Sequence, residues 1–388
     1  MEKRLTKQEK KQLWIFVAAA FGLPLLMGVL MGINFYRGAD VSVFPNAQMY
    51  YPAAGVMLAV LLTRKPEDRV PVKFYTGFLV LTGILMALCV VSVFLPQVSM
   101  AAAVNLVLIV GSLISWVLLL LEKKEIRRKF GLSWGRGSRE DSETPGEARQ
   151  GIRPWLWILL FLFLYFLRIF LNYVVEGMPG AFFPPFANPY VWLNLALLPL
   201  SFFMAYTAFF GEEYGWRGFF QPILQKRYGK RLGVLILGVC WGLWHLPLNL
   251  FYYSPDTWLQ SVFTQQTTCI GLGIFFGLAM MKTKNIWVPV IMHFYNNNLI
   301  AVMAGTGDVI SGQMIRWIDV LLLLGLNGVL FASFILAKDY RKEKPLESWE
   351  PGKETEPEKA VGSEKAVGSE KAAEAEGETE YEVQSGSL

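Results

Sequence analysis

The feature of this sequence that most constrains its fold is a series of long apolar runs. A helix that crosses the hydrocarbon core of a bilayer needs roughly 20 mostly apolar residues. Runs of this kind are expected at about residues 13–36, 47–63, 74–95, 100–121, 154–175, 189–211, 232–253, 265–281, 285–303 and 317–337. The composition agrees, because 54% of the residues are hydrophobic and only 17% are charged, which favours a membrane protein over a soluble multidomain one. The sequence therefore predicts an all-α, polytopic transmembrane helical bundle of about ten spans.

The distribution of Lys and Arg predicts the orientation of these spans. Basic residues cluster in alternate loops, at 3–11, 64–73, 123–129, 226–231, 282–284 and 338–344, and the intervening loops hold only Arg37 and Arg316. This alternation follows the positive-inside rule. We therefore expect an integral, multi-pass protein of a bacterial cytoplasmic membrane, with both termini in the cytoplasm. The first span is too long for a signal peptide and is expected to be retained. The net charge of +5 reflects this topology, and the expected partner is the lipid bilayer and not a nucleic acid.

Composition divides the chain into five predicted regions. They are a four-span block at 1–121, a cytoplasmic linker rich in Gly, Ser and acidic residues at 122–153, a core at 154–305, a final span with its flanks at 306–344, and an acidic tail at 345–388. The tail has twelve Glu and four Lys and repeats the hexamer EKAVGS. Such a composition predicts disorder. We expect a solvated tail, with a docking segment for a soluble partner as the alternative.

The three cysteines lie within predicted spans at Cys89, Cys240 and Cys269. Their spacing fits neither a disulfide framework nor a thiolate metal site. We expect them to act as small apolar packing residues.

Ionisable residues inside the core spans are the strongest indication of function. The chain has only two histidines, His245 and His293, and both lie within predicted spans. Counted from the nearest cytoplasmic basic residue, Glu213 and His245 lie roughly 20 Å deep and His293 roughly 13 Å, at about 1.5 Å per helical residue. Charged residues at such depth are costly and mark functional paths or sites. Three separate spans thus place ionisable groups at comparable depth.

The spacing of these residues predicts how they are arranged. Glu213 and Arg217 are i,i+4 neighbours, so an ion pair is available on one helix face. Glu212 is rotated by about 100° from Glu213, which leaves one carboxylate to hold Arg217 and the other free to react. His293 and Asn297 are also i,i+4 neighbours and form a plausible donor pair for an oxyanion.

Three short motifs in this order resemble the CPBP intramembrane protease family. This family includes the type II CAAX prenyl endopeptidases and the Abi-type bacteriocin-immunity proteins. The matching positions are Glu212, Glu213 and Arg217, then Trp241 and His245, then His293 and Asn297. Trp241 departs from the usual Phe, which would alter the pocket wall. The resemblance covers roughly residues 155–305.

The resemblance implies an intramembrane endopeptidase with a cavity open to the cytoplasm. Glu212 would act as general base on a water that His245 helps to position, and His293 and Asn297 would stabilise the oxyanion. Glu213 and Arg217 would hold the first carboxylate in place. No firm metal is expected. Zinc bound by His245, His293 and Glu212 is the alternative. The substrate would be a peptide or membrane protein, cut near its C-terminus or in a precursor segment, and whether it is prenylated stays open.

Simpler interpretations remain for the same residues. Glu212 and Glu213 could cap a span at the interface, each histidine could bond to a neighbouring helix, and Asn296 or Asn298 could replace Asn297. The charges could also serve a transporter. Transporters commonly have two related halves, but residues 1–121 do not repeat the Glu-Glu or His motifs. A catalytically silent scaffold is a further alternative. Arg168, in the middle of a span, could pair with Glu212 or Glu213, bind a substrate carboxylate or extend to the interface, and we favour a structural pairing.

Overall fold

The structure is a computed structural model that describes residues 5–134, 153–305 and 310–341. Within these ranges the chain forms helices and no strand. The prediction of an all-α protein is therefore confirmed. The acidic tail and most of the predicted linker lie outside the described residues.

The helices follow one another with short connections. The N-terminal part contains α1 (Lys7–Val17), η1 (Ala18–Gly22), α2 (Leu23–Tyr36), α3 (Val43–Gln48), α4 (Tyr51–Thr63), α5 (Val72–Phe94), α6 (Ala101–Leu120) and α7 (Lys124–Lys129). The central part contains α8 (Pro154–Val175), η4 (Pro179–Phe182), η5 (Pro184–Ala187), α9 (Pro189–Glu213), η6 (Tyr214–Phe220), α10 (Gln221–Tyr228), α11 (Lys230–Trp244), α12 (Leu246–Leu248) and η7 (Asn249–Tyr253). The last part contains η8 (Pro255–Thr257), α13 (Trp258–Thr283), α14 (Trp287–Ala304), α15 (Trp317–Leu330), η9 (Ala332–Leu336) and α16 (Lys338–Arg341).

Among the described residues, eight continuous helical stretches are long and apolar enough to cross a membrane. They cover eight of the ten predicted ranges. The other two ranges, 47–63 and 285–303, fall on α4 and α14, which have 13 and 18 residues and are not among the eight. The chain is an integral, multi-pass membrane protein, with a span count close to the one predicted.

The first motif lies on the longest of these stretches, Pro189–Tyr228. Glu212 and Glu213 are the last two residues of α9, and the helix continues without a break into the wider π-helical turn η6 and then into α10. π-helical turns are rare in proteins, and those that occur are often found at functional sites. The predicted span at 189–211 therefore ends just before Glu212 and Glu213, whereas the helix itself continues past them.

The N-terminal helices pack directly against the back of this segment. The backbone of Gly211 approaches the Met49 carbonyl oxygen, and Gly215 lies against Pro52 at the start of α4. Only glycine permits such close approach, because a Cβ at either position would overlap α3–α4 backbone atoms. The Gln48 amide also donates a hydrogen bond to the Trp244 carbonyl oxygen at 2.9 Å. Residues of the 1–121 block thus contact the segments that carry Glu212 and His245.

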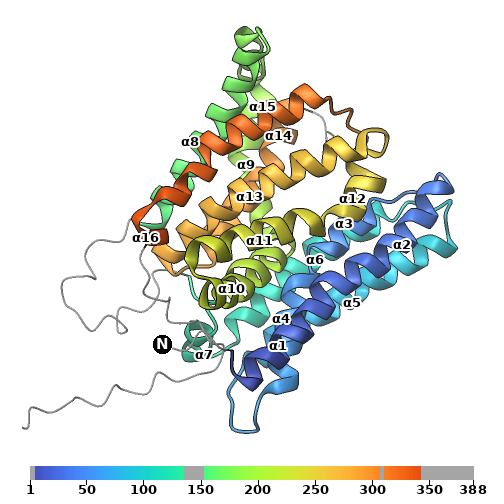
Figure 1. The fold of residues 1–388 in the computed structure, drawn as a ribbon. Coiled ribbons are helices and arrows are strands. Elements are labelled where there is room, and N and C mark those ends of the chain that lie inside the picture. Colours follow the sequence, from blue (N-terminus) through green and yellow to red (C-terminus); the bar gives the residue numbers. More distant parts are fainter. Residues whose placement is uncertain (1–4, 135–152, 306–309, 342–388) are drawn as a thin grey trace, which may run out of the picture. The chain divides into compact units, whose positions relative to one another are not determined.

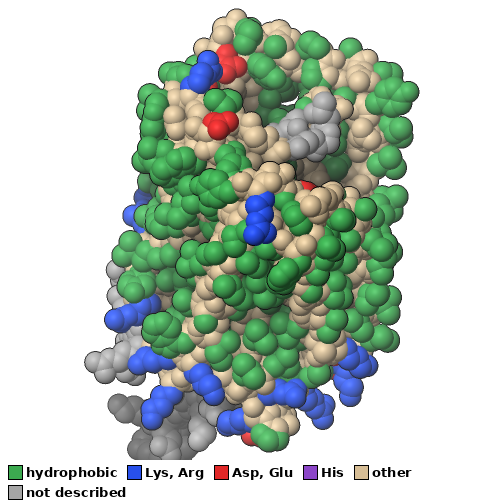
Figure 2. Space-filling view, turned by 90° about the vertical axis from the view of Figure 1, so that its right-hand side faces the viewer, with side chains coloured by type: hydrophobic (Ala, Val, Ile, Leu, Met, Phe, Trp, Pro, Cys, Tyr) green, Lys and Arg blue, Asp and Glu red, His purple; other side chains and the backbone are tan. Residues whose placement is uncertain are grey.

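On its other side the site is bounded by α13. This helix lies alongside α11 and α15 (Figure 1), and its contact with α11 is close because Gly238 faces the backbone of Ile270. Figure 2 shows a mostly hydrophobic face with Lys and Arg side chains gathered along its lower edge. This is the surface pattern that a bilayer with a charged boundary requires.

Candidate functional site

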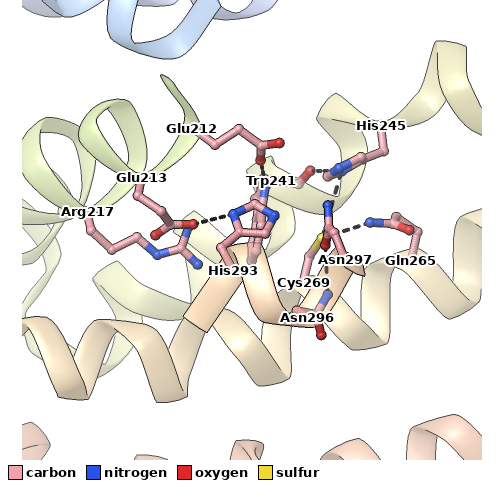
Figure 3. A network of polar contacts seen from close by, with 10 residues as sticks. All are labelled: Glu212, Glu213, Arg217, Trp241, His245, Gln265, Cys269, His293, Asn296 and Asn297. Carbon is pink, nitrogen blue, oxygen red and sulfur yellow. Dashed lines mark hydrogen bonds and ion pairs between the residues drawn. The ribbon is translucent and has the colours of Figure 1, made fainter. Parts of the chain in front are cut away.

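Glu213 lies at the centre of a buried ion-pair network. Its Oε1 atom accepts hydrogen bonds from Arg217 Nη1 at 3.1 Å and from His293 Nδ1 at 2.8 Å. The predicted i,i+4 ion pair between Glu213 and Arg217 is therefore confirmed. Figure 3 shows these side chains converging from α9, η6 and α14. One oxygen of Glu213 is thus engaged by two donors, which fixes the orientation of both the guanidinium and the imidazole.

Trp241, on α11, connects Glu212 and Arg217 with the two histidines. Its indole Nε1 donates a hydrogen bond to Glu212 Oε2 at 2.7 Å, and the Arg217 guanidinium carbon lies 4.2 Å from the centre of its ring. The ring centre is 5.5 Å from that of His293 and 6.1 Å from that of His245. From the sequence we expected this residue only to alter the pocket wall. Because an indole carries an N–H that a phenyl ring lacks, the departure from Phe adds a hydrogen bond to Glu212.

His245 follows the last residue of α11 and precedes the short helix α12. Its Nδ1 atom lies 2.8 Å from the Trp241 carbonyl oxygen. A carbonyl oxygen only accepts hydrogen bonds, so we assign the proton to Nδ1, which leaves Nε2 of the neutral ring as an acceptor. Cys269 Sγ lies 3.8 Å from the same Nδ1. Cys269 is therefore in contact with a motif histidine, which its expected role as plain apolar packing did not anticipate.

The three consecutive asparagines have different surroundings. Asn298 Nδ2 donates to the Phe294 carbonyl oxygen at 2.8 Å and so bonds to its own helix. Asn296 Nδ2 donates to Asn297 Oδ1 at 3.0 Å, and no described residue accepts a hydrogen bond from the Asn297 amide nitrogen. Figure 3 shows Asn297 on the His245 side of the cluster. Asn297 is the asparagine whose amide N–H groups are available at the site.

The charges of the cluster are nearly shielded from water. Glu212, Glu213 and Arg217 have exposed fractions of 2%, 0% and 1%. Two carboxylates and one guanidinium leave one negative charge in excess, and an uncompensated buried charge is costly. Protonation of His293, whose Nδ1 already faces Glu213, would make the sum zero.

The alternative zinc site requires His245, His293 and Glu212 to reach one metal ion. Among the described residues, no three His, Cys, Asp or Glu side chains are arranged so that one metal ion could bind them all. His245, His293 and Glu212 as placed therefore do not form a three-ligand zinc site.

Arg168 has a different partner from those expected. Its Nη1 atom donates to Asn327 Oδ1 at 3.3 Å, and its guanidinium carbon lies 5.1 Å above the Tyr165 ring. Asn327 in turn donates to Thr268 Oγ1 at 3.1 Å. The suggested pairing with Glu212 or Glu213 is wrong, because the side chain reaches α15 instead. The favoured structural role holds with another partner, since this chain of hydrogen bonds links α8, α15 and α13.

The central segment of the chain is similar to known proteins. Residues 194–299 match the family of Rce1-like type II CAAX prenyl endopeptidases. This match is narrower than the expected 155–305 but contains every residue of the three motifs. A curated CAAX prenyl protease 2 of Methanococcus maripaludis is 29% identical over 127 residues, which are 30% of this chain and 46% of that protein.

The chain thus spans about half the length of the curated relative it matches. No solved structure matches the chain. The segment that matches the family, residues 194–299, carries the whole ion-pair network described above. Over residues 194–299 the chain is therefore similar to the Rce1-like type II CAAX prenyl endopeptidases.

Proposed function

We propose that this protein is an intramembrane endopeptidase in which Glu212 activates a water molecule for hydrolysis of a peptide bond. The observation that carries the proposal is the convergence on Trp241 of Glu212, Arg217 and both histidines, which come from three separate helical segments. The match of residues 194–299 to the Rce1-like type II CAAX prenyl endopeptidases also supports peptidase chemistry.

Glu212 is the proposed general base. Trp241 holds its Oε2 atom at 2.7 Å, and no described residue donates a hydrogen bond to its Oε1 atom. An oriented carboxylate oxygen without a protein donor can accept a proton from water. The Nε2 atom of neutral His245 accepts a second hydrogen bond from the same water and so fixes its attack direction. Glu213 has the supporting role, because its Oε1 atom orients both Arg217 and His293, although its Oε2 atom also lacks a hydrogen-bond partner among the described residues.

The reaction proceeds in two steps. The water oxygen bonds to the peptide carbonyl carbon while its proton passes to Glu212, which gives a tetrahedral oxyanion. The C–N bond then breaks, and the proton on Glu212 passes to the leaving amine. Protonated His293, through Nε2–H, and the Asn297 amide donate hydrogen bonds to the oxyanion, a contribution worth about 3 kcal/mol per donor in comparable sites.

We further infer that the site is reached from the cytoplasm and acts on a C-terminal or precursor peptide of a membrane-associated substrate. Clusters of Lys and Arg next to the site-bearing helices support this orientation. Because the curated relative is named a CAAX prenyl protease, a peptide with an S-prenylated cysteine near its C-terminus is the first probe.

The decisive experiment compares wild type with Glu212→Gln in nanodiscs and in cells. Cleavage of the prenylated probe, and quantitative proteomics of membranes for uncut substrate, are the two measurements. Glu122→Gln is the matched control, because Glu122 is also a buried glutamate and binds the Phe74 N–H at 3.2 Å away from the motifs. We expect loss of cleavage only in Glu212→Gln. Wild-type cleavage by that variant, with normal insertion, would falsify the assignment of the base.

A further inference from the structure

A groove in the apolar surface lies between α2 and the segment that follows His245. It encloses about 620 Å³, a volume within the range of small-molecule sites. One wall is formed by α2, and the other by α12 and the start of η7. Figure 1 shows α2 beside α12. The groove therefore lies where the N-terminal block meets the residues that come directly after a motif histidine.

Two glycines of α2 bring the walls together along the floor of the groove. A Cβ on Gly28 would lie 2.8 Å from Pro247 Cβ, and a Cβ on Gly32 would lie 3.1 Å from Phe251 Cζ. The helix reaches its neighbour at these two positions because neither residue has a side chain. The contacts fix the opposite wall against α2, so the groove is a defined feature of the packing.

The side chains that rise beside these glycines are apolar and exposed. Leu25, Val29 and Ile33 follow one another at four-residue spacing along α2, with exposed fractions of 62, 64 and 36%. Among the described residues that line the groove, Arg37 alone is charged. An apolar hollow of this kind on a membrane protein fits a hydrocarbon chain.

The length of the groove matches one leaflet of a bilayer. Between Leu25 and Tyr36 the helix α2 rises roughly 17 Å, at about 1.5 Å per residue, and half of a hydrocarbon core is about 15 Å. Tyr36 ends α2 with 82% of its surface exposed, as is typical of aromatic residues at the membrane boundary. Arg37 lies at the opposite end of this helical stretch from the basic residue Lys7. The groove thus extends from that boundary to near the bilayer centre.

Arg37 supplies a positive charge at the boundary end of the groove. Its Nη1 atom donates a hydrogen bond to the Val93 carbonyl oxygen at 3.2 Å, and no described carboxylate is paired with it. Asp40, which is close in sequence, instead accepts hydrogen bonds from the Ser42 N–H at 2.8 Å and the Ser99 hydroxyl at 2.6 Å. The guanidinium is exposed and keeps N–H groups that suit a phosphate.

We propose that the groove binds one acyl chain of an anionic phospholipid from the leaflet that borders Arg37, with the lipid phosphate at the guanidinium. The chain packs against Pro247 and Phe251 and holds α12 and η7 against α2. This contact stabilises the position of the segment that follows His245. An effect of the lipid on catalysis rests on the proposed function, whereas the binding of the lipid does not.

Photocrosslinking of the full-length protein in phosphatidylcholine nanodiscs tests the site. The probe is a small fraction of phosphatidylglycerol with a diazirine at the end of one acyl chain, and the crosslinked residues are mapped by mass spectrometry. We expect several-fold more labelling around Leu25 and Leu246 than on the exposed face of α6 at Leu106 and Leu113. The same diazirine on phosphatidylcholine, which has no net charge, should label the groove less.

Two pairs of variants separate the apolar and the charged part of the site. Val29→Trp places a large side chain in the groove and should lower the labelling to the level of α6. Leu26→Trp is its matched control, because Leu26 is 57% exposed on the same helix and does not line the groove. Arg37→Gln should reduce labelling by phosphatidylglycerol to that by phosphatidylcholine, and Arg64→Gln, at an exposed arginine that does not line the groove, should not.

Three results would overturn the proposal. They are labelling of the groove by phosphatidylglycerol no stronger than that of α6, a preference for phosphatidylglycerol that Arg37→Gln leaves unchanged, and displacement of the label by the prenylated peptide probe. The last result would make the groove part of the substrate site.

A second measurement connects the lipid with catalysis. Cleavage of the probe by the wild type should rise several-fold when phosphatidylglycerol is added to phosphatidylcholine nanodiscs, and Arg37→Gln should remove this rise. A protein that is labelled as expected but cleaves no peptide would refute the proposed function and leave the lipid site standing. Cleavage that does not respond to phosphatidylglycerol, with labelling as expected, would refute only the effect of the lipid on catalysis.

Discussion

Replacement of Gly215 by alanine should destabilise the protein, although the same change favours most helices. The new Cβ would overlap Pro52 Cβ and lie 2.7 Å from the Pro52 carbonyl carbon and 2.9 Å from its Cα. The last two are backbone atoms of α4, which move only with the whole helix. Overpacking of this kind costs about 1–3 kcal/mol, and the gain in helix propensity offsets at most about 1 kcal/mol. We expect a net loss of about 1–2 kcal/mol in the free energy of unfolding.

Thermal and denaturant unfolding in a defined detergent measure this loss. Gly22→Ala is the control, because a Cβ there has no heavy atom within 4 Å and should be neutral or slightly stabilising. Gly211→Ala should resemble Gly215→Ala, since its Cβ would meet the Met49 carbonyl oxygen and lie 3.0 Å from Tyr50 Cα. Equal stability of all three variants and wild type would show that α4 does not pack closely against the segment that carries Glu212 and Glu213.

Four further predictions concern the site and its surroundings. Trp241→Phe removes the donor to Glu212 and should lower probe cleavage about tenfold or more, because a hydrogen bond to a charged group contributes about 1.5–3 kcal/mol; unchanged kcat would contradict this role. Arg217→Lys loses the stacked contact with Trp241 and should lower the free energy of unfolding by about 1–2 kcal/mol, measured by denaturation, whereas an unaltered midpoint would refute it. Asn327→Leu removes the partner of Arg168 and should cost about 1–2 kcal/mol in the same assay without changing KM; a change confined to KM would instead indicate contact with substrate. Chelators that bind zinc should leave cleavage intact, and loss of activity that added zinc restores would overturn the metal-free mechanism.

The sequence was informative wherever one local rule decides the outcome. The length of the apolar runs correctly placed eight of the ten spans on helices that are long and apolar enough to cross a membrane. This rule works because backbone N–H and C=O groups in lipid must form their hydrogen bonds within the helix itself. The Glu213–Arg217 pair followed from i,i+4 spacing, since both residues lie on one continuous helix. The two shorter ranges, 47–63 and 285–303, were harder because α4 and α14 are shorter or more polar than the rule requires.

Contacts between distant segments could not be read in the same way. Arg168 was expected to find a carboxylate, and no pattern in the sequence indicates that α15 carries Asn327 to it. Nor does spacing reveal that the Trp241 indole points at Glu212, because this depends on how α11 is rotated against α9. The presence of Trp where related proteins usually have Phe was the one available signal. It indicated an additional N–H donor but not the residue that accepts its hydrogen bond.

The support of the site comes largely from outside the segment that defines the family. All motif residues lie within 194–299, yet Pro52 limits the approach of Gly215, Gln48 binds the Trp244 carbonyl, and Tyr340 reaches α13 beside Gln221. A buried ion pair is weak evidence for stability by itself, because desolvation offsets much of its attraction unless the geometry is held by neighbours. In this chain those neighbours are the N-terminal block and the helix that follows the last span. It follows that a fragment limited to 194–299 would retain every motif residue but lose the contacts that fix Glu212 and Glu213, so the additional spans are part of the site's physical basis.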